Sequence, residues 1–118
     1  MKRWRYYVTA AGKDIAKDEL SALDPAAKAV VLQAMSRHRS GKLFPREEEH
    51  IDGDLHAIRV FFGGCTYRVL YAYEGQSDQV LLALHVITKK QRRLSPATRK
   101  LALKRLADWR GRARLDPR

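Results

Sequence analysis

Four side chains that could bind a phosphate or carry a proton recur along three β-like segments of the sequence. In chain order they are Arg59, Arg68, His85 and Lys89. Because strand side chains alternate between the two faces of a sheet, these four share one face if the segments pair as neighbours. Arginine and lysine stabilise charge on a phosphoryl group, and histidine moves protons near neutral pH. Such a set predicts metal-free cleavage of RNA, in which cations hold the phosphate while a side chain takes the proton of a 2′-hydroxyl.

The rest of this predicted face carries small side chains. Ala57, Ala72 and Ala83 lie on it beside the cations, so we expect an open surface with room for a ligand. The bulkier alternating sets are expected to pack against helices. These sets are 56/58/60/62, 67/69/71/73 and 80/82/84/86. The assignment assumes that no β-bulge shifts the phase of a strand.

The elements that would position these side chains form an α+β pattern. We predict a strand over 3–9, helices over 13–23 and 24–40, a loop over 42–53, an antiparallel meander of strands over 55–62, 65–73 and 79–88, and a helix over 95–110. The pairs Asp24-Pro25 and Ser95-Pro96 are typical helix starts. Glycines at 41 and 111 are typical helix ends, and the tail 112–118 is expected to fray. The first two helices form a predicted hairpin with a very short connection.

Two of these segments carry more specific expectations. Gly63-Gly64 indicates a tight turn between the first two strands of the meander. The acidic run at 47–49 is expected to lie in a solvated loop. The second helix should bury one stripe of side chains at helical spacing. Its members are Ala27, Val31, Ala34, Met35 and His38.

The charge of the chain indicates a polyanionic partner. The 118 residues suit a single domain, 1–118, and carry a formal net charge of +11. Residues 1–54 hold ten Lys/Arg and nine Asp/Glu, whereas residues 55–118 hold fourteen and four. The polyanion is therefore expected to meet mainly the second half of the chain. Basic residues expected to touch RNA there are Lys90, Arg92, Arg93, Lys100 and Lys104.

Other classes of protein are disfavoured by the composition. No apolar run is long enough to span a bilayer, and the start lacks a signal-type apolar region, so we expect a cytoplasmic protein without a membrane partner. Cys65 is the only cysteine, which excludes a disulfide framework and a cysteine-based metal site. The strands carry no carboxylates with metal-ligand spacing. We therefore expect neither a metal nor another cofactor.

Three stretches resemble the HigB-like branch of the RelE/ParE toxin superfamily, of phage-derived type. They are residues 54–64, residues 66–71 (Thr-Tyr-Arg-Val-Leu-Tyr) and residues 84–90 (Leu-His-Val-Ile-Thr-Lys-Lys), the last followed by Pro96 and a basic helix. That family typically reads leucine–aromatic–Glu–Leu–Arg, then Tyr-Arg-hydrophobic-hydrophobic-Tyr, then His-x-Phe-x-Lys-Lys. The order of predicted elements is similar as well, and the resemblance covers nearly the whole chain.

The resemblance implies a RelE-like fold and the toxin of a type II toxin–antitoxin pair. Such a toxin is a ribosome-dependent mRNA endoribonuclease that inhibits translation, contacts ribosomal RNA and is bound by an antitoxin, here expected to be a helix-turn-helix protein. By position, Arg68 is similar to the arginine on the scissile phosphate and Arg59 to a basic strand residue. His85, with Lys89 or Lys90, falls where the remaining active-site cations lie.

The chain departs from the family pattern at several positions. Ala57 stands where the family often has glutamate, Ile87 replaces a phenylalanine, and no tyrosine follows Tyr73. The sequence therefore leaves the identity of the proton acceptor open. It also leaves two other functions open: a ParE-like toxin that poisons DNA gyrase, and a non-catalytic nucleic-acid-binding or protein-binding relative with the same fold.

Overall fold

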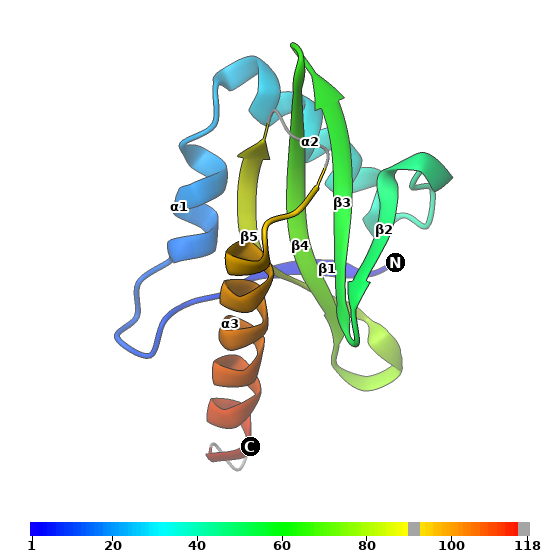
Figure 1. Ribbon diagram of the computed structural model, residues 1–118. Coiled ribbons are helices and arrows are strands. Elements are labelled where there is room, and N and C mark those ends of the chain that lie inside the picture. The colour runs from blue at the N-terminus through cyan, green and yellow to red at the C-terminus, as the bar shows by residue number, and fades with distance from the viewer. Residues whose placement is uncertain (90–92, 116–118) are drawn as a thin grey trace.

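A five-stranded sheet with helices on both faces forms the body of the molecule (Figure 1). The computed structural model describes residues 1–89 and 93–115, without the side chains of residues 89, 114 and 115. Its elements are β1 (Arg3–Tyr6), α1 (Ile15–Ser21), α2 (Pro25–Arg39), β2 (Glu48–Asp52), β3 (Leu55–Phe62), β4 (Cys65–Glu74), β5 (Val80–Lys89) and α3 (Pro96–Leu115). Single 3-10 turns occur at Pro45–Glu47 and Gln76–Asp78. The predicted α+β class and element order are confirmed.

The strands lie in the order β1-β5-β4-β3-β2. β1 is parallel to β5, and the other pairs are antiparallel, as predicted for the meander. Gly63 and Gly64 both have positive φ, +59° and +78°, which the tight turn between β3 and β4 requires and which glycine adopts at little cost. This turn fixes the register, so that Phe62 lies opposite Cys65 and each earlier residue of β3 has a defined partner in β4.

Each face of the sheet has its own apolar core. On the face covered by α2, the buried side chains include Val31, Ala34, Met35, Ile58, Val60, Val69, Tyr71, Leu81, Ala83 and Val86. On the face covered by α3, they include Leu55, Ala57, Leu70, Ala72, Leu82, Leu84, Ala102 and Leu106. We refer to these as the α2 face and the α3 face. A sheet covered on both sides buries apolar residues at consecutive positions, which weakens the alternation that sequence patterns rely on.

Helix α2 begins and ends as its sequence predicts. The Asp24 carboxylate accepts a hydrogen bond from the Ala26 amide at 3.2 Å, and Pro25 occupies the first helical position. Gly41, with φ of +73°, follows the end of the helix. The five residues of the predicted apolar stripe, His38 included, are all buried. The predicted stripe is therefore confirmed.

Helix α1 lies along the outer edge of β5 (Figure 1). β1 pairs with β5 only over residues 80–83, so the outer edge of β5 beyond that point has no strand beside it. Ala16 of α1 packs into the α3-face core and Leu20 into the α2-face core, so the helix straddles the sheet edge. The predicted short connection to α2 is confirmed, and the two helices then cover different parts of the sheet.

A β-bulge in β5 overturns part of the predicted facing of side chains. Leu70 lies opposite His85 while Tyr71 lies opposite Ala83, so Leu84 is an extra residue in β5. On the Leu70 side of the bulge His85 shares the face of Arg68, as predicted, but that face is covered by α3. On the other side the phase is reversed, and Ala83 packs on the α2 face.

Three residues of the 80/82/84/86 set were therefore predicted wrongly. The bulge places Leu82 and Leu84 in the α3-face core, and Val80, opposite Glu74, shares the phase of Leu82. Only Val86 packs on the α2 face as expected. The physical reason is that Val80 to Leu84 are all apolar and buried, so the sequence carries no alternation from which to read the phase.

The predicted loop over 42–53 contains an edge strand. β2 pairs antiparallel with β3, and its side chains alternate between exposed and half-buried positions. The acidic run is not fully solvated: Glu47 is buried and its Oε2 accepts from Arg37 Nη2 at 2.6 Å. Three consecutive glutamates read as a loop, but an edge strand tolerates charge because one side of it faces water.

Helix α3 continues through the glycine that was expected to end it. Gly111 keeps helical geometry, and the helix extends to Leu115, so the predicted end at residue 110 is wrong. Contacts of Arg112 explain the continuation, because its guanidinium donates to the Val8 carbonyl and to Asp108, and stacks over Tyr7. Residues 112–115 therefore extend the helix instead of fraying, and 116–118 lie outside the described residues.

Candidate active site on the α3 face

The strand register places three of the four predicted catalytic side chains together. Arg59 and Arg68 are direct cross-strand partners on β3 and β4. His85 lies opposite Leu70, two residues along β4 from Arg68, which makes it a diagonal neighbour at roughly 7–8 Å between Cα atoms. Lys89 ends β5 opposite Thr66 and so has the same phase, with its side chain outside the described part of the chain.

This face is not the open surface that was expected. Ala57 and Ala72 are fully buried in the core beneath α3, so their small size serves close helix packing and leaves no room for a ligand. Arg68 is only 1% exposed. The side chains of Arg59 and His85 are 32% and 14% exposed. A ligand would reach the site from the end of the face that α3 does not cover.

Arg59 and Arg68 share one carboxylate. Oε1 of Glu49, on β2, accepts from Arg68 Nε at 3.1 Å, and its Oε2 lies 3.6 Å from Arg59 Nη1. Arg59 also donates to the Arg46 carbonyl at 3.3 Å. Two guanidinium groups directly across a strand pair repel each other, and Glu49 reduces that repulsion. We call Glu49, Arg59 and Arg68 the arginine cluster; its formal charge is +1.

A hollow of about 240 Å³ opens beside the arginine cluster. It is lined by Arg59, Phe61, Thr66 and Arg68. Phe61 is 61% exposed, and Arg59 lies over its ring at 5.6 Å from the centroid. The hollow therefore presents cationic groups next to an exposed aromatic ring, which suits a phosphate attached to a nucleoside.

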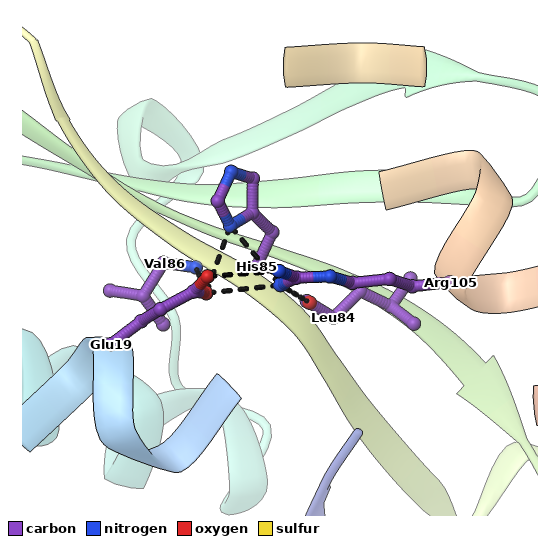
Figure 2. A network of polar contacts seen from close by, with 5 residues as sticks. All are labelled: Glu19, Leu84, His85, Val86 and Arg105. Carbon is purple, nitrogen blue, oxygen red and sulfur yellow. Dashed lines mark hydrogen bonds and ion pairs between the residues drawn. The ribbon is translucent and has the colours of Figure 1, made fainter. Parts of the chain in front are cut away.

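His85 is held by charged side chains from two helices (Figure 2). Its Nδ1 lies 2.8 Å from Glu19 Oε1, and Arg105 Nη1 and Nη2 donate to the two oxygens of Glu19 at 3.1 Å. Two backbone groups complete the arrangement: the Val86 amide donates to Glu19 Oε1 at 3.0 Å, and the Leu84 carbonyl accepts from Arg105 Nη1 at 2.8 Å. We call Glu19, His85 and Arg105 the His85 network.

The network compensates for the irregularity of β5. Leu84 is the bulged residue, and its carbonyl is satisfied by Arg105 of α3. Val86 lies on the outer edge beyond the end of β1, and its amide is satisfied by Glu19 of α1. Buried backbone groups without partners are costly, so both helices contribute a side chain where the strand ladder is interrupted.

The ionised state of Glu19 bears on which ring nitrogen of His85 holds the hydrogen. Burial raises the pKa of Glu19, but hydrogen bonds from His85, Arg105 and the Val86 amide outweigh it and hold this pKa at about 2. An ionised carboxylate is only an acceptor, so the 2.8 Å contact with Glu19 favours a hydrogen on Nδ1, and Arg105 Nη1 lies farther from the same atom, at 3.3 Å. In a neutral ring Nε2 then has a free lone pair, and Figure 2 shows Nε2 directed away from Glu19 and Arg105.

The family of the chain follows from its sequence. Residues 18–107 match the family described as phage-derived protein Gp49-like. The chain is a member of the Gp49-like family. This family belongs to the RelE/HigB-like group of toxin–antitoxin toxins, which the five-stranded α+β fold also fits. A search of the curated proteins found no match.

Membership of the Gp49-like family confirms part of what the resemblance implied. Toxins of this group act with a cognate antitoxin, so such a partner is implied for this chain as well. Within residues 1–89 and 93–115, no group of three His, Cys, Asp or Glu side chains could hold a metal ion. Nor is any helix in that part of the Gp49-like chain long and apolar enough to cross a membrane.

The basic residues predicted to touch RNA fall into three groups in the Gp49-like chain. Lys100 and Lys104 are exposed on α3, and Arg93 is exposed just before that helix. Lys90 and Arg92 lie outside the described residues. Arg110 of α3 is instead engaged within the chain, where it pairs with Glu74 at 2.9 Å and Asp54 at 2.8 Å.

Three charged residues of the site were not found from the sequence. Arg105 has a detectable signal, because Ala102, Arg105 and Leu106 share the helical spacing of one buried stripe. Glu49 has a weaker one, since alternate residues of 48–52 would face the same side of a strand. Glu19 has none, because nothing local indicates that a helix of seven residues lies along the edge of β5.

Proposed function

We propose that this chain is a type II toxin that cleaves mRNA on the ribosome and thereby inhibits translation. The observation that carries the proposal is one sheet face with two arginines beside a hollow and, diagonally from them, a histidine with a fixed orientation. Cleavage of an RNA strand by its own 2′-hydroxyl requires a cationic site for the phosphate next to a group that accepts the hydroxyl proton. Membership of the toxin group makes RNA on the ribosome the favoured substrate.

The roles of the residues follow from their positions. Arg59 and Arg68 bind the scissile phosphate in the hollow and stabilise the charge that develops on it. His85 Nε2 takes the proton from the 2′-hydroxyl, the bond from O2′ to phosphorus forms, and the bond from phosphorus to O5′ breaks. The products are a 2′,3′-cyclic phosphate and a 5′-hydroxyl. The 5′-oxygen takes its proton from water, and the imidazolium returns its proton to solvent. Lys89, at the end of β5 opposite Thr66, adds positive charge for the phosphate.

The exposed basic residues provide the longer-range attraction. Arg93, Lys100 and Lys104, with Lys90 and Arg92, surround the start of α3 in sequence and bind phosphates of mRNA and ribosomal RNA. A helix-turn-helix antitoxin is the proposed partner that blocks these contacts, and the cytoplasm is the compartment in which both ligands occur. Acidic segments of such an antitoxin would complement the surplus positive charge of the second half of the chain.

Cleavage of mRNA on purified, programmed ribosomes tests this proposal. The wild-type protein should cut ribosome-bound mRNA and leave the same RNA intact when it is free. Arg68→Gln should lower the rate about a hundredfold or more, because an uncharged amide cannot stabilise the phosphate charge. Arg39→Gln is the matched control, since Arg39 is exposed at the end of α2 on the opposite side of the sheet.

Two results would contradict the proposal. One is an Arg68→Gln protein that is folded, by circular dichroism, and cuts as fast as the wild type. The other is growth arrest with DNA-damage signalling and normal incorporation of labelled amino acids, which would favour a gyrase poison.

A further inference from the structure

The orientation of His85 depends on two residues that do not reach the hollow. Glu19 comes from α1 and Arg105 from α3, and each also bonds the backbone of β5 next to His85. Arg105 is 7% exposed, and the side chain of Glu19 is 22% exposed. Neither residue lines the hollow beside Arg59 and Arg68.

We infer that Glu19 and Arg105 are positioning residues that hold His85 with its hydrogen on Nδ1, so that Nε2 is the atom that accepts the proton of the 2′-hydroxyl. This inference rests on the proposed ribonuclease function for its catalytic part. Its structural part, the tautomer and its dependence on Glu19, does not depend on that function.

The contacts assign a different task to each positioning residue. Glu19 Oε1 lies 2.8 Å from His85 Nδ1 and accepts from the Val86 amide at 3.0 Å, so the carboxylate is tied to the same strand that carries the histidine. A carboxylate behind an imidazole selects the tautomer and stabilises the imidazolium that forms on proton transfer. Arg105 bonds both oxygens of Glu19, which prevents the carboxylate from rotating.

A role confined to stability would not require this arrangement around the ring. Glu19 and Arg105 would satisfy each other and the two backbone groups without His85. The ring instead uses Nδ1 inside the network and leaves Nε2 outside it (Figure 2). The charged groups around His85 are Glu19 from α1, Arg105 from α3 and, diagonally on β4, Arg68. Arg68 places positive charge on the side where the phosphate would bind.

Nitrogen-15 NMR of the imidazole rings in the full-length protein tests the structural part directly. At a pH where the ring is neutral, His85 of the wild type should carry its hydrogen on Nδ1, although an unrestrained histidine favours Nε2. Glu19→Gln should shift the ring toward the other tautomer or a mixture. Asp54→Asn is the matched control, because it also replaces a carboxylate bound to an α3 arginine, at 2.8 Å from Arg110, and should leave His85 unchanged.

Cleavage kinetics on ribosomes test the catalytic part. Glu19→Gln should lower kcat about tenfold to a hundredfold, part of what a positioned general base supplies, and leave KM unchanged because Glu19 does not touch RNA. Glu19→Asp keeps the charge and should retain more activity. Arg105→Lys should fall between them, because a lysine cannot hold both carboxylate oxygens in a fork.

Each outcome decides one part of the inference. A wild-type ring with its hydrogen on Nε2 overturns it without any variant, even if Glu19→Gln fails to fold. A changed tautomer with an unchanged kcat overturns the catalytic part. If the wild type does not cut ribosome-bound mRNA at all, the ribonuclease proposal fails, while the tautomer measurement still decides whether Glu19 orients His85.

Discussion

The arginine cluster and the His85 network lie on the same face of one sheet and are built in opposite ways. The arginine cluster draws its three side chains from adjacent strands, keeps a net positive charge and borders a hollow. The His85 network draws its side chains from α1, β5 and α3 and ties both of its charged ends to backbone groups of β5. Each contains one glutamate: Glu49 lies between two arginine side chains, whereas Glu19 bonds Arg105 and the backbone of β5.

In the proposed reaction, the two regions would have different tasks. Surplus charge next to a hollow is suited to an incoming anion, and Glu49 stands in for that anion when the site is empty of RNA. A network whose Glu19 and Arg105 are paired with each other and bonded to the backbone is not suited to bind an anion, and it fixes an orientation instead. The comparison therefore predicts that loss of Glu19 lowers the stability of the protein, whereas loss of the charge of Glu49 mainly changes its affinity for RNA.

The largest expected effect is on stability, from Glu19→Ala. This change leaves the buried Arg105 guanidinium without its carboxylate and the Val86 amide without its acceptor. Removing one partner of a buried ion pair costs about 3–5 kcal/mol of unfolding free energy. Urea denaturation of the purified protein measures the loss. Glu49→Ala should cost less, because Glu49 accepts only from side chains in the contacts described here.

A double-mutant cycle strengthens this test. Glu19→Ala combined with Arg105→Ala should cost clearly less than the sum of the two single changes, because the second change removes the charge that the first left buried. Equal losses for Glu19→Ala and Glu49→Ala, or additive losses in the cycle, would contradict the contrast between the two regions.

The next effect is the dependence of stability on acid. The pKa of Glu19 is about 2 in the folded protein against an ordinary 4.5, so the folded state favours the ionised carboxylate. A lowered carboxylate pKa contributes stability that is fully present above the ordinary value and is lost as the pH falls through the folded value. For Glu19 the window runs from about pH 5 down to about pH 2, and the loss is at most about 3 kcal/mol.

Because other carboxylates titrate in the same window, the measurement is a difference between two proteins. Unfolding free energies are compared at several pH values for the wild type and Glu19→Gln. The variant should start less stable at neutral pH and lose less on acidification, so that the two curves converge. Parallel curves over this window would show that Glu19 is not held ionised by the network.

The sequence predicted the arginines better than the side chains that hold them. Arg59 and Arg68 were placed correctly because a two-glycine turn fixes the register of β3 and β4. In β5 the residues before the bulge are apolar on both faces, so nothing in the sequence marks Leu84 as the extra residue. His85 was nevertheless assigned correctly to the face of Arg68, because it lies beyond the bulge, where the pairing of β5 with β4 keeps the predicted phase.

The partners could not be predicted because they depend on how distant elements pack. Glu19 and His85 are separated by 66 residues and Glu19 and Arg105 by 86. Their contacts exist only because α1 occupies the edge that β1 leaves free and because α3 crosses the bulge. Glu49 was missed for a different reason, since three adjacent glutamates resemble a solvated loop more than an edge strand.

The smallest expected effect concerns RNA binding, from Glu49→Gln. Removing this charge takes away the carboxylate that contacts both arginines, so a phosphate no longer competes with Glu49 for the two guanidinium groups. Binding of a fluorescent single-stranded RNA should tighten several-fold, about 1 kcal/mol. Its dependence on salt should steepen by up to about 0.7 in log–log slope, since one further phosphate contact can form.

Glu19→Gln is the matched comparison in the same assay, because it makes the same chemical change in the other region. It should leave both the affinity and the salt slope as in the wild type, since the His85 network does not bind the phosphate. The binding curves must be measured at several salt concentrations, because a tighter single value could come from general electrostatics alone. Weaker binding by Glu49→Gln would mean that Glu49 arranges the arginines for RNA instead of competing with it. In that case the two regions would resemble each other more than their contacts suggest, since a glutamate would then be a positioning residue in both.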